Sequence, residues 1–205
     1  MIAERKATLV LASRNIRKIA ELKKLLFDKF PQITFLSLLD FPKLELPPLQ
    51  AQTLKARSAQ KAEVVAKVTG LVTLSDEWVL IIPSLGGELE SIRKKDLPRK
   101  NMLPDTNALL LELQGKEGLD RTAYCECSQT LASPVKGILK SVSARMEGTI
   151  AEVERGQSST EFASVFMKYD YGKTIGELPP SIQAVLSTRK KALDALQTTL
   201  NAALT

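Results

Sequence analysis

Histidine is absent from this chain of 205 residues, and its absence excludes several kinds of site at once. Without histidine there is no serine–histidine triad, no histidine general base and no histidine metal ligand. Cysteine is nearly absent as well, because Cys125 and Cys127 are the two cysteines of the sequence. Two thiols are too few for a closed zinc site. We therefore interpret both as small buried side chains on one side of a strand, in a protein without a disulfide scaffold.

Aromatic residues and long apolar runs are also scarce. Aromatics make up 5% of the chain and do not alternate with basic residues, which argues against a stacking platform for single-stranded nucleic acid. No apolar run approaches the roughly 20 residues that a membrane-spanning helix needs. The apolar run near the N-terminus is short and leads into a helical pattern, which is not typical of a signal peptide. We therefore predict a cytoplasmic protein with no membrane contact and no nucleic-acid partner.

Basic residues exceed acidic residues. Lysine and arginine number 29 against 23 aspartates and glutamates, which gives a formal charge of +6. Such a balance favours anionic partners, and by itself it does not choose between nucleotides, nucleic acid and acidic surfaces. The sequence "SIRKKDLPRK", residues 91–100, is the most basic stretch. We interpret it as a solvated loop in preference to a nucleic-acid contact.

The pattern of apolar residues predicts a single α/β domain with a mixed sheet. Its first part alternates strands at 7–13, 33–41 and 71–76 with helices at 16–29 and 53–68. Asn15 or Ser13 is the expected N-cap of the first helix, and Gly70 is the expected end of the second. Later segments predict a helix from Asp105 to Gln114, an antiparallel pair at 121–133 and 137–150, and a final helix at 188–203.

Residues 12–18, "ASRNIRK", form a candidate phosphate site between a strand and a helix. Ser13 and Asn15 offer hydrogen bonds, Lys18 adds positive charge, and the helix N-terminus offers free N–H groups. Ordinary helix capping explains the same residues and is the favoured interpretation when this stretch is taken alone.

Asp76 and Glu77 form a second candidate site at the predicted end of a strand. Two carboxylates are suited to bind Mg²⁺ or to orient a hydrolytic water. Adjacent strand residues point to opposite faces, so both can serve one ion only if the strand turns there. Lys61 is a further cationic candidate, although alone it is part of a solvated basic stripe. Arg189 lies just inside a predicted helix N-terminus, where its charge opposes the helix dipole unless an anionic or carbonyl ligand compensates it.

These candidates occur within seven short motifs that follow one another along the chain. They are Ala12-Ser13 with Asn15 and Lys18; Thr53 with Lys61 and Ala62; Asp76–Val79; Ser91-Ile92-Arg93; Met146–Ile150; Glu154–Gly156; and Ser187-Thr188-Arg189 with Ala192 and Leu193. In this order they resemble the motifs of the inosine triphosphate pyrophosphatase family, and of its chlamydial branch in particular. The similarity extends from Leu9 to about Leu196.

The resemblance implies a fold, a reaction and a set of site residues. The fold would be an elongated mixed sheet flanked by helices, with two lobes around a central cleft in one domain over residues 1–205, usually as a homodimer. The reaction would be Mg²⁺-dependent hydrolysis of ITP, dITP or XTP to a monophosphate and pyrophosphate. Asp76, Glu77 and Lys61 would be catalytic, the two acids holding the metal. The residues that would bind the nucleotide are Ser13, Asn15, Lys18, Arg93, Ser187 and Arg189.

The chain departs from the family pattern at several of its active-site positions. A metal-binding glutamate of the family aligns with Leu49 or Gln50, and the histidine of its last motif is Thr188. A glycine-rich loop is replaced by "STEFAS", residues 159–164, and a lysine by Gln183. The alternative is therefore a degenerate member that binds nucleotides or proteins without catalysis.

Overall fold

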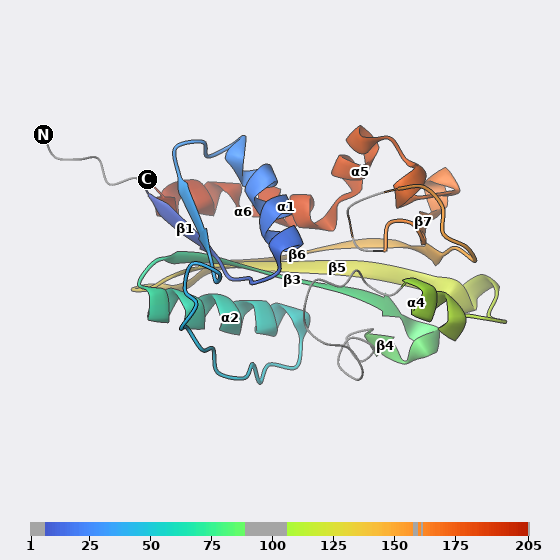
Figure 1. Ribbon diagram of the computed structural model, residues 1–205, viewed down its shortest axis with the longest axis horizontal. Helices are drawn as coiled ribbons and strands as arrows, with labels where there is room; N and C mark the ends of the chain where they lie inside the picture. The colour runs from blue at the N-terminus through green and yellow to red at the C-terminus, as the bar shows by residue number, and fades with distance from the viewer. Residues whose placement is uncertain (1–6, 89–105, 158–159, 161, 205) are drawn as a thin grey trace, which may run out of the picture. The chain divides into compact units, whose positions relative to one another are not determined.

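A computed structural model describes residues 7–88, 106–157, 160 and 162–204 (Figure 1). The strands of its sheet follow the order β2-β1-β3-β5-β6-β7-β8, and β4 pairs with β3. The strand β1 is parallel to both β2 and β3, whereas the pairs β3–β4, β6–β7 and β7–β8 are antiparallel. The predicted α/β class with a mixed sheet is therefore confirmed.

The helices and strands follow the predicted alternation in the first part of the chain. Their bounds are β1 Thr8–Leu11, α1 Ile16–Phe27, β2 Thr34–Ser37, α2 Leu54–Thr69, β3 Val72–Ile82, β4 Gly87–Glu88, α4 Thr106–Glu112, β5 Thr122–Ser133, β6 Gly137–Ile150, β7 Phe166–Lys168, β8 Lys173–Thr174, α5 Pro180–Leu186 and α6 Thr188–Leu204. One predicted boundary was wrong in a way that matters for the site. The strand β3 continues to Ile82, so Asp76 and Glu77 lie inside it and not at its end.

The chain forms two compact units. The first comprises the described residues of Met1–Trp78, Cys127–Ala144 and Arg189–Thr205, and the second those of Val79–Glu126 and Arg145–Thr188. The strands β3, β5 and β6 each contribute residues to both units. No helix in the described part of the chain is long and apolar enough to cross a membrane.

In the first unit, helices cover both faces of the sheet (Figure 1). Leu9 and Leu11 of β1 pack in one apolar cluster with Leu22 of α1 and Leu193 of α6. Val10, between them, packs on the other side with Val65 of α2. Because successive strand residues point to opposite faces, each position of β3 is likewise assigned to the α1/α6 layer or to the α2 layer. Full burial of such leucines contributes about 1.5–3 kcal/mol each.

Caps fix where the first two helices begin and end. The Asn15 side chain accepts hydrogen bonds from the backbone N–H groups of Arg17 and Lys18, so α1 begins directly after β1. Thr53 caps α2 in the same way, and Gly70 ends α2 with a left-handed φ of 68°. These caps are the ones that the sequence predicts.

Candidate functional site

The candidate site lies along β3, just beyond the point where its neighbour β1 ends. The parallel pairing reaches Leu11 and Leu74, and the N–H of Ala12 then donates to the Leu74 carbonyl at 2.9 Å. Two residues further along β3, the Lys18 ammonium donates to the Asp76 carbonyl at 2.8 Å. The carboxyl ends of parallel strands are where open α/β sheets bind ligands. The loop from Ser13 to Asn15 leaves the sheet at this same end.

Asp76 is the centre of a buried network on the α1/α6 side of the sheet, and only 2% of its surface is exposed. The Arg189 Nε of α6 donates to both carboxylate oxygens, at 3.2 and 3.1 Å. Gln129 Nε2 and Cys127 Sγ, both from β5, donate to Oδ1 at 2.9 and 3.2 Å. The Lys18 Nζ of α1 lies 3.5 Å from Oδ2. Arg189 Nη1 also pairs with Glu21 of α1.

The charges of this network shift the ionisation of its members. Burial alone would raise the pKa of Asp76, but the charges of Arg189 and Lys18, together with the hydrogen bonds, lower it well below its usual value. Burial, aided by the nearby Asp76 charge, raises the pKa of the Cys127 thiol. Burial would lower the pKa of Arg189, yet Asp76 and Glu21 raise it. Asp76 is therefore a carboxylate and Cys127 a thiol at neutral pH.

Glu77 lies on the opposite side of the sheet from Asp76, in the α2 layer. Its Oε1 accepts from the Lys61 ammonium of α2 at 2.8 Å. The exposed fractions of the two side chains are 16% for Glu77 and 19% for Lys61, so this pair is far more accessible than Asp76. Just before Lys61, the side chain of Gln60 accepts from the backbone N–H groups of Gln50 and Ala51. Gln60 thus holds the loop that carries Gln50 close to this face of α2.

The placement of the two acids bears on how a metal ion could bind. Among the described residues, no group of three or more histidine, cysteine, aspartate or glutamate side chains could hold a metal. The Asp76 oxygens already face two cationic groups, whereas Glu77 has Lys61 on one oxygen. Because β3 does not turn between them, a single ion shared by Asp76 and Glu77 would require β3 to rearrange. With 16% of its side chain exposed, Glu77 is the more accessible carboxylate of the two.

The remaining predicted site residues lie in different parts of the chain. Ser13 is 7% exposed, and its Oγ accepts from the Asn15 N–H at 3.1 Å, so both side chains act in local turns and caps. Ser187 follows α5 directly and belongs to the second unit. Arg93 lies outside the described residues, as do Ser91 and the basic stretch at 91–100. Their predicted roles stay predictions.

Gln129, Cys127 and Glu21 take part in the network, and sequence reasoning did not identify them as site residues. Cys127 was expected to be a simple buried side chain, and it is buried but also donates to Asp76. Gln129 stands in a strand whose residues are buried on both faces, so alternation gives no sign of its role. The sequence did contain one sign of it: Gln129 follows Cys127 by two positions, so a polar side chain lies on the same face of the strand as Cys127.

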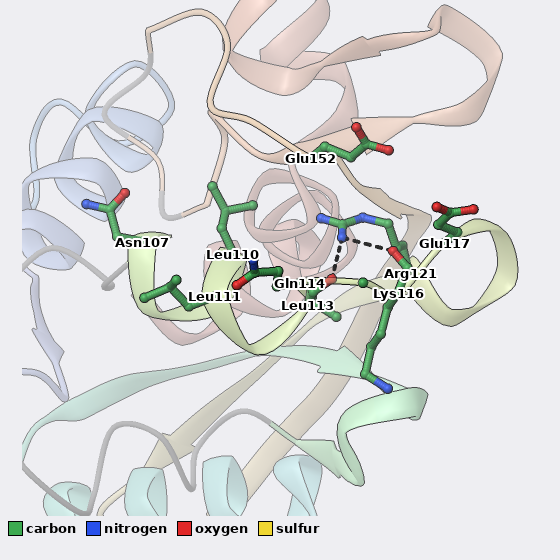
Figure 2. Close-up of a pocket in the computed structure, with 10 residues that line it drawn as sticks. Asn107, Leu110, Leu111, Leu113, Gln114, Lys116, Glu117, Arg121 and Glu152 are labelled. Atoms are coloured by element: carbon green, nitrogen blue, oxygen red, sulfur yellow. Dashed lines mark hydrogen bonds between the residues drawn. The ribbon is translucent and has the colours of Figure 1, made fainter.

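The second unit contains a pocket of about 600 Å³ lined by α4, the segment 113–117 that follows it, Arg121 and Glu152 (Figure 2). Buried Arg121 borders it, but its guanidinium already donates to the carbonyls of Leu113, Lys116, Ile150 and Ala151. Its donors hold the backbone together and are not directed at a ligand. Of the predicted site residues that the structure describes, none lines this pocket.

Comparisons with known proteins concern the family of the chain. A sequence model of the Ham1 family matches residues 9–199. The dITP/XTP pyrophosphatase of Chlamydia trachomatis serovar L2 is 36% identical over 198 residues, which cover 92% of this chain and 90% of that protein. The dITP/XTP pyrophosphatase of Geobacter sulfurreducens is 31% identical over 191 residues, covering 92% and 94%.

Solved structures of Ham1 proteins have a fold similar to that of this chain. A HAM1 protein from Coxiella burnetii superposes with a TM-score of 0.75 at 28% identity, covering 96% of this chain and 100% of that one. The Ham1 protein of Staphylococcus aureus gives a TM-score of 0.76 at 22% identity, covering 95% and 98%, and so bears on the fold alone. The mixed α/β fold expected from the sequence motifs is confirmed.

Proposed function

Because the chain belongs to the Ham1 family, we propose that it hydrolyses deaminated purine nucleoside triphosphates of the dITP and XTP type. Water attacks the α-phosphorus, the bond from that phosphorus to the oxygen bridging to the β-phosphorus breaks, and a monophosphate and pyrophosphate leave. The observation that carries this proposal is the 36% identity to a dITP/XTP pyrophosphatase over 92% of the chain. That degree of likeness does not favour the alternative of a binding protein without catalysis.

Lys18 is the residue best placed to hold the triphosphate. Its side chain is 18% exposed, and its ammonium is held beside β3 by the backbone carbonyl and the carboxylate of Asp76. An ammonium held in this way neutralises phosphate charge without first having to be ordered. We assign Ser13 and Asn15 to hydrogen bonds with the phosphates, and Arg93 to the cationic lining around them. Ser187 and Arg189 are proposed to contact the nucleoside.

Glu77 is the residue best placed to act on water. Its carboxylate is accessible, and the Lys61 ammonium at 2.8 Å fixes it and balances its charge. We assign Glu77 to orient the attacking water and to accept its proton, which is general base catalysis. Buried Asp76 has four surrounding donors and a lowered pKa, and its part is to hold Lys18 and Arg189. It is therefore a structural carboxylate in this scheme.

We further propose that Mg²⁺ binds with the substrate at Glu77. There it would stabilise negative charge on the phosphates, a contribution worth several kcal/mol at a phosphoryl centre. A homodimer in the cytoplasm completes the proposal, and light scattering coupled to size-exclusion chromatography tests the dimer.

The reaction is tested by following pyrophosphate release over a panel of purine triphosphates, with the Glu77→Gln variant as control. We expect Mg²⁺-dependent release from dITP and XTP that exceeds release from dATP and dGTP. A protein that is stabilised thermally by these nucleotides but releases no pyrophosphate would instead be a binding protein.

A further inference from the structure

Gln129 joins two parts of the buried network that are far apart in the sequence. Its side chain is fully buried in β5. Its Nε2 donates to Asp76 Oδ1 at 2.9 Å and to the backbone carbonyl of Arg189 at 3.1 Å. Both partners are acceptors, so the atom between them has to be the amide nitrogen. One amide group therefore links the middle of β3 to the first turn of α6.

The oxygen of the same amide, Oε1, does not link two groups in this way. Within the described residues, Gln129 Oε1 is buried and has no hydrogen-bond partner. A buried acceptor without a donor destabilises the folded protein, because it has lost its hydrogen bonds to water. A methionine of similar length would fill the same space without that penalty, but it would lose the two hydrogen bonds that Nε2 donates. The two bonds that Nε2 donates, to Asp76 and to the Arg189 carbonyl, are therefore what the glutamine supplies at this position.

We propose that Gln129 is a positioning residue for the phosphate-binding Lys18, a role that rests on the function proposed above. Gln129 Nε2, Cys127 Sγ and Arg189 Nε all reach Asp76 Oδ1, so this oxygen is directed toward β5 and α6. The second oxygen, Oδ2, then faces Lys18 Nζ, while the Asp76 carbonyl accepts from the same ammonium. Gln129 thus sets the rotation of the carboxylate that fixes Lys18.

A neutral donor suits this position better than a charged one. The network contains Lys18 and Arg189 as cations and Asp76 and Glu21 as anions, so its formal charges balance. A third cation would compete with Lys18 for Asp76, whereas an amide orients Asp76 and leaves its charge available to Lys18. By the same reasoning, Gln129→Glu would place a second carboxylate against Asp76 and disrupt the network more than Gln129→Met does.

The test is a comparison of Gln129→Met with the natural protein and with Thr130→Val. Thr130 is the next residue of β5, is equally buried, and points to the other face, where its Oγ1 bonds Ser141. For Gln129→Met we expect the KM for dITP to rise about tenfold, because Asp76 loses the charge-assisted hydrogen bond that orients it toward Lys18. We expect kcat to stay within about twofold, and the denaturant midpoint to fall, because two buried hydrogen bonds are lost. Thr130→Val should leave KM and kcat unchanged.

The possible results separate the two proposals. If the natural protein releases no pyrophosphate from dITP or XTP, the proposed function fails and the role of Gln129 fails with it. If the natural protein is active and folded Gln129→Met has the same KM, only the role of Gln129 is wrong. If Gln129→Met does not fold, or if its KM rises no more than that of Thr130→Val, the glutamine serves the fold alone and the proposal is overturned. Gln129→Glu should raise KM further and lower the denaturant midpoint.

Discussion

Asp76 and Glu77 are neighbours in the chain, yet their surroundings give them different chemistry. Asp76 is buried against Arg189, Lys18, Gln129 and Cys127 on one face of β3. Glu77 has Lys61 as its partner on the other face and is accessible to solvent. Two carboxylates whose environments differ in this way take different roles in enzymes. We accordingly assign Asp76 to positioning and Glu77 to catalysis.

The assignment of Glu77 predicts a large loss of turnover on a small change of structure. Glu77→Gln keeps the size of the side chain but removes its charge and its ability to accept a proton. We expect kcat for pyrophosphate release from dITP to fall about 10²–10⁴-fold, as for the loss of a general base. Glu63→Gln is the matched control, since Glu63 pairs with Lys67 on the same helix as Lys61 but at an exposed position. Comparable losses in both variants would refute the assignment.

The role of Asp76 predicts a pH-dependent contribution to stability. Its pKa in the folded protein lies well below 3.8, the usual value of a free aspartate, so the folded state favours the carboxylate. The stabilisation is therefore complete at neutral pH and is lost as the pH falls below about 4. We expect Asp76→Asn to lower the free energy of unfolding by about 3–5 kcal/mol at pH 7, because it leaves Arg189 buried and unbalanced. Urea titrations from pH 7 to pH 3 should show this difference shrinking; a difference that grows toward low pH would contradict the account.

At the scale of the secondary-structure elements, the N-terminus of α1 has two possible uses that a single substitution can separate. Asn15 caps α1 by accepting from two backbone N–H groups, and its side chain is also proposed to bond a phosphate. Asn15→Asp keeps the cap and adds a negative charge. We expect the free energy of unfolding to change by less than about 0.5 kcal/mol, since both residues cap equally well. We also expect the KM for dITP to rise at least about fivefold through charge repulsion.

Asn15→Ala provides the comparison for that experiment, because it removes the cap and should cost about 1 kcal/mol. Thr53→Ala removes the equivalent cap of α2 and should lower stability without raising KM. If Asn15→Asp binds dITP as well as the natural protein does, Asn15 is a helix cap and nothing more.

The sequence predicted most of the elements because their signals are local. Asn15, Thr53 and Gly70 are cap residues within a turn of the helix ends that they fix. The length of β3 was not predicted, because two adjacent acids are typical of an exposed strand end. They remain inside the strand because Lys18, Lys61 and Arg189 compensate them. Arg189 lies 113 residues from Asp76 and Gln129 lies 53 residues from it, so their contacts depend on the tertiary fold.

At the scale of the whole molecule, the excess of positive charge should assist binding of a triphosphate. The formal charge is +6, and Lys18 and Lys61 are both partly accessible. Salt screens such attraction, with a Debye length that falls from about 10 Å at 0.1 M to about 3 Å at 1 M. We expect the KM for dITP to rise several-fold over this range while kcat changes little. A KM that is independent of salt would show that long-range charge contributes nothing to binding.

The central claim is that this chain splits deaminated purine triphosphates between the α- and β-phosphates. The most direct measurement is to incubate the purified protein with dITP and Mg²⁺ and to identify both products by ion-exchange chromatography. The account predicts dIMP and pyrophosphate in equal amounts, with formation reduced at least about a hundredfold in Glu77→Gln. Release of inorganic phosphate with dIDP, or product formation that is the same in Glu77→Gln, would contradict it.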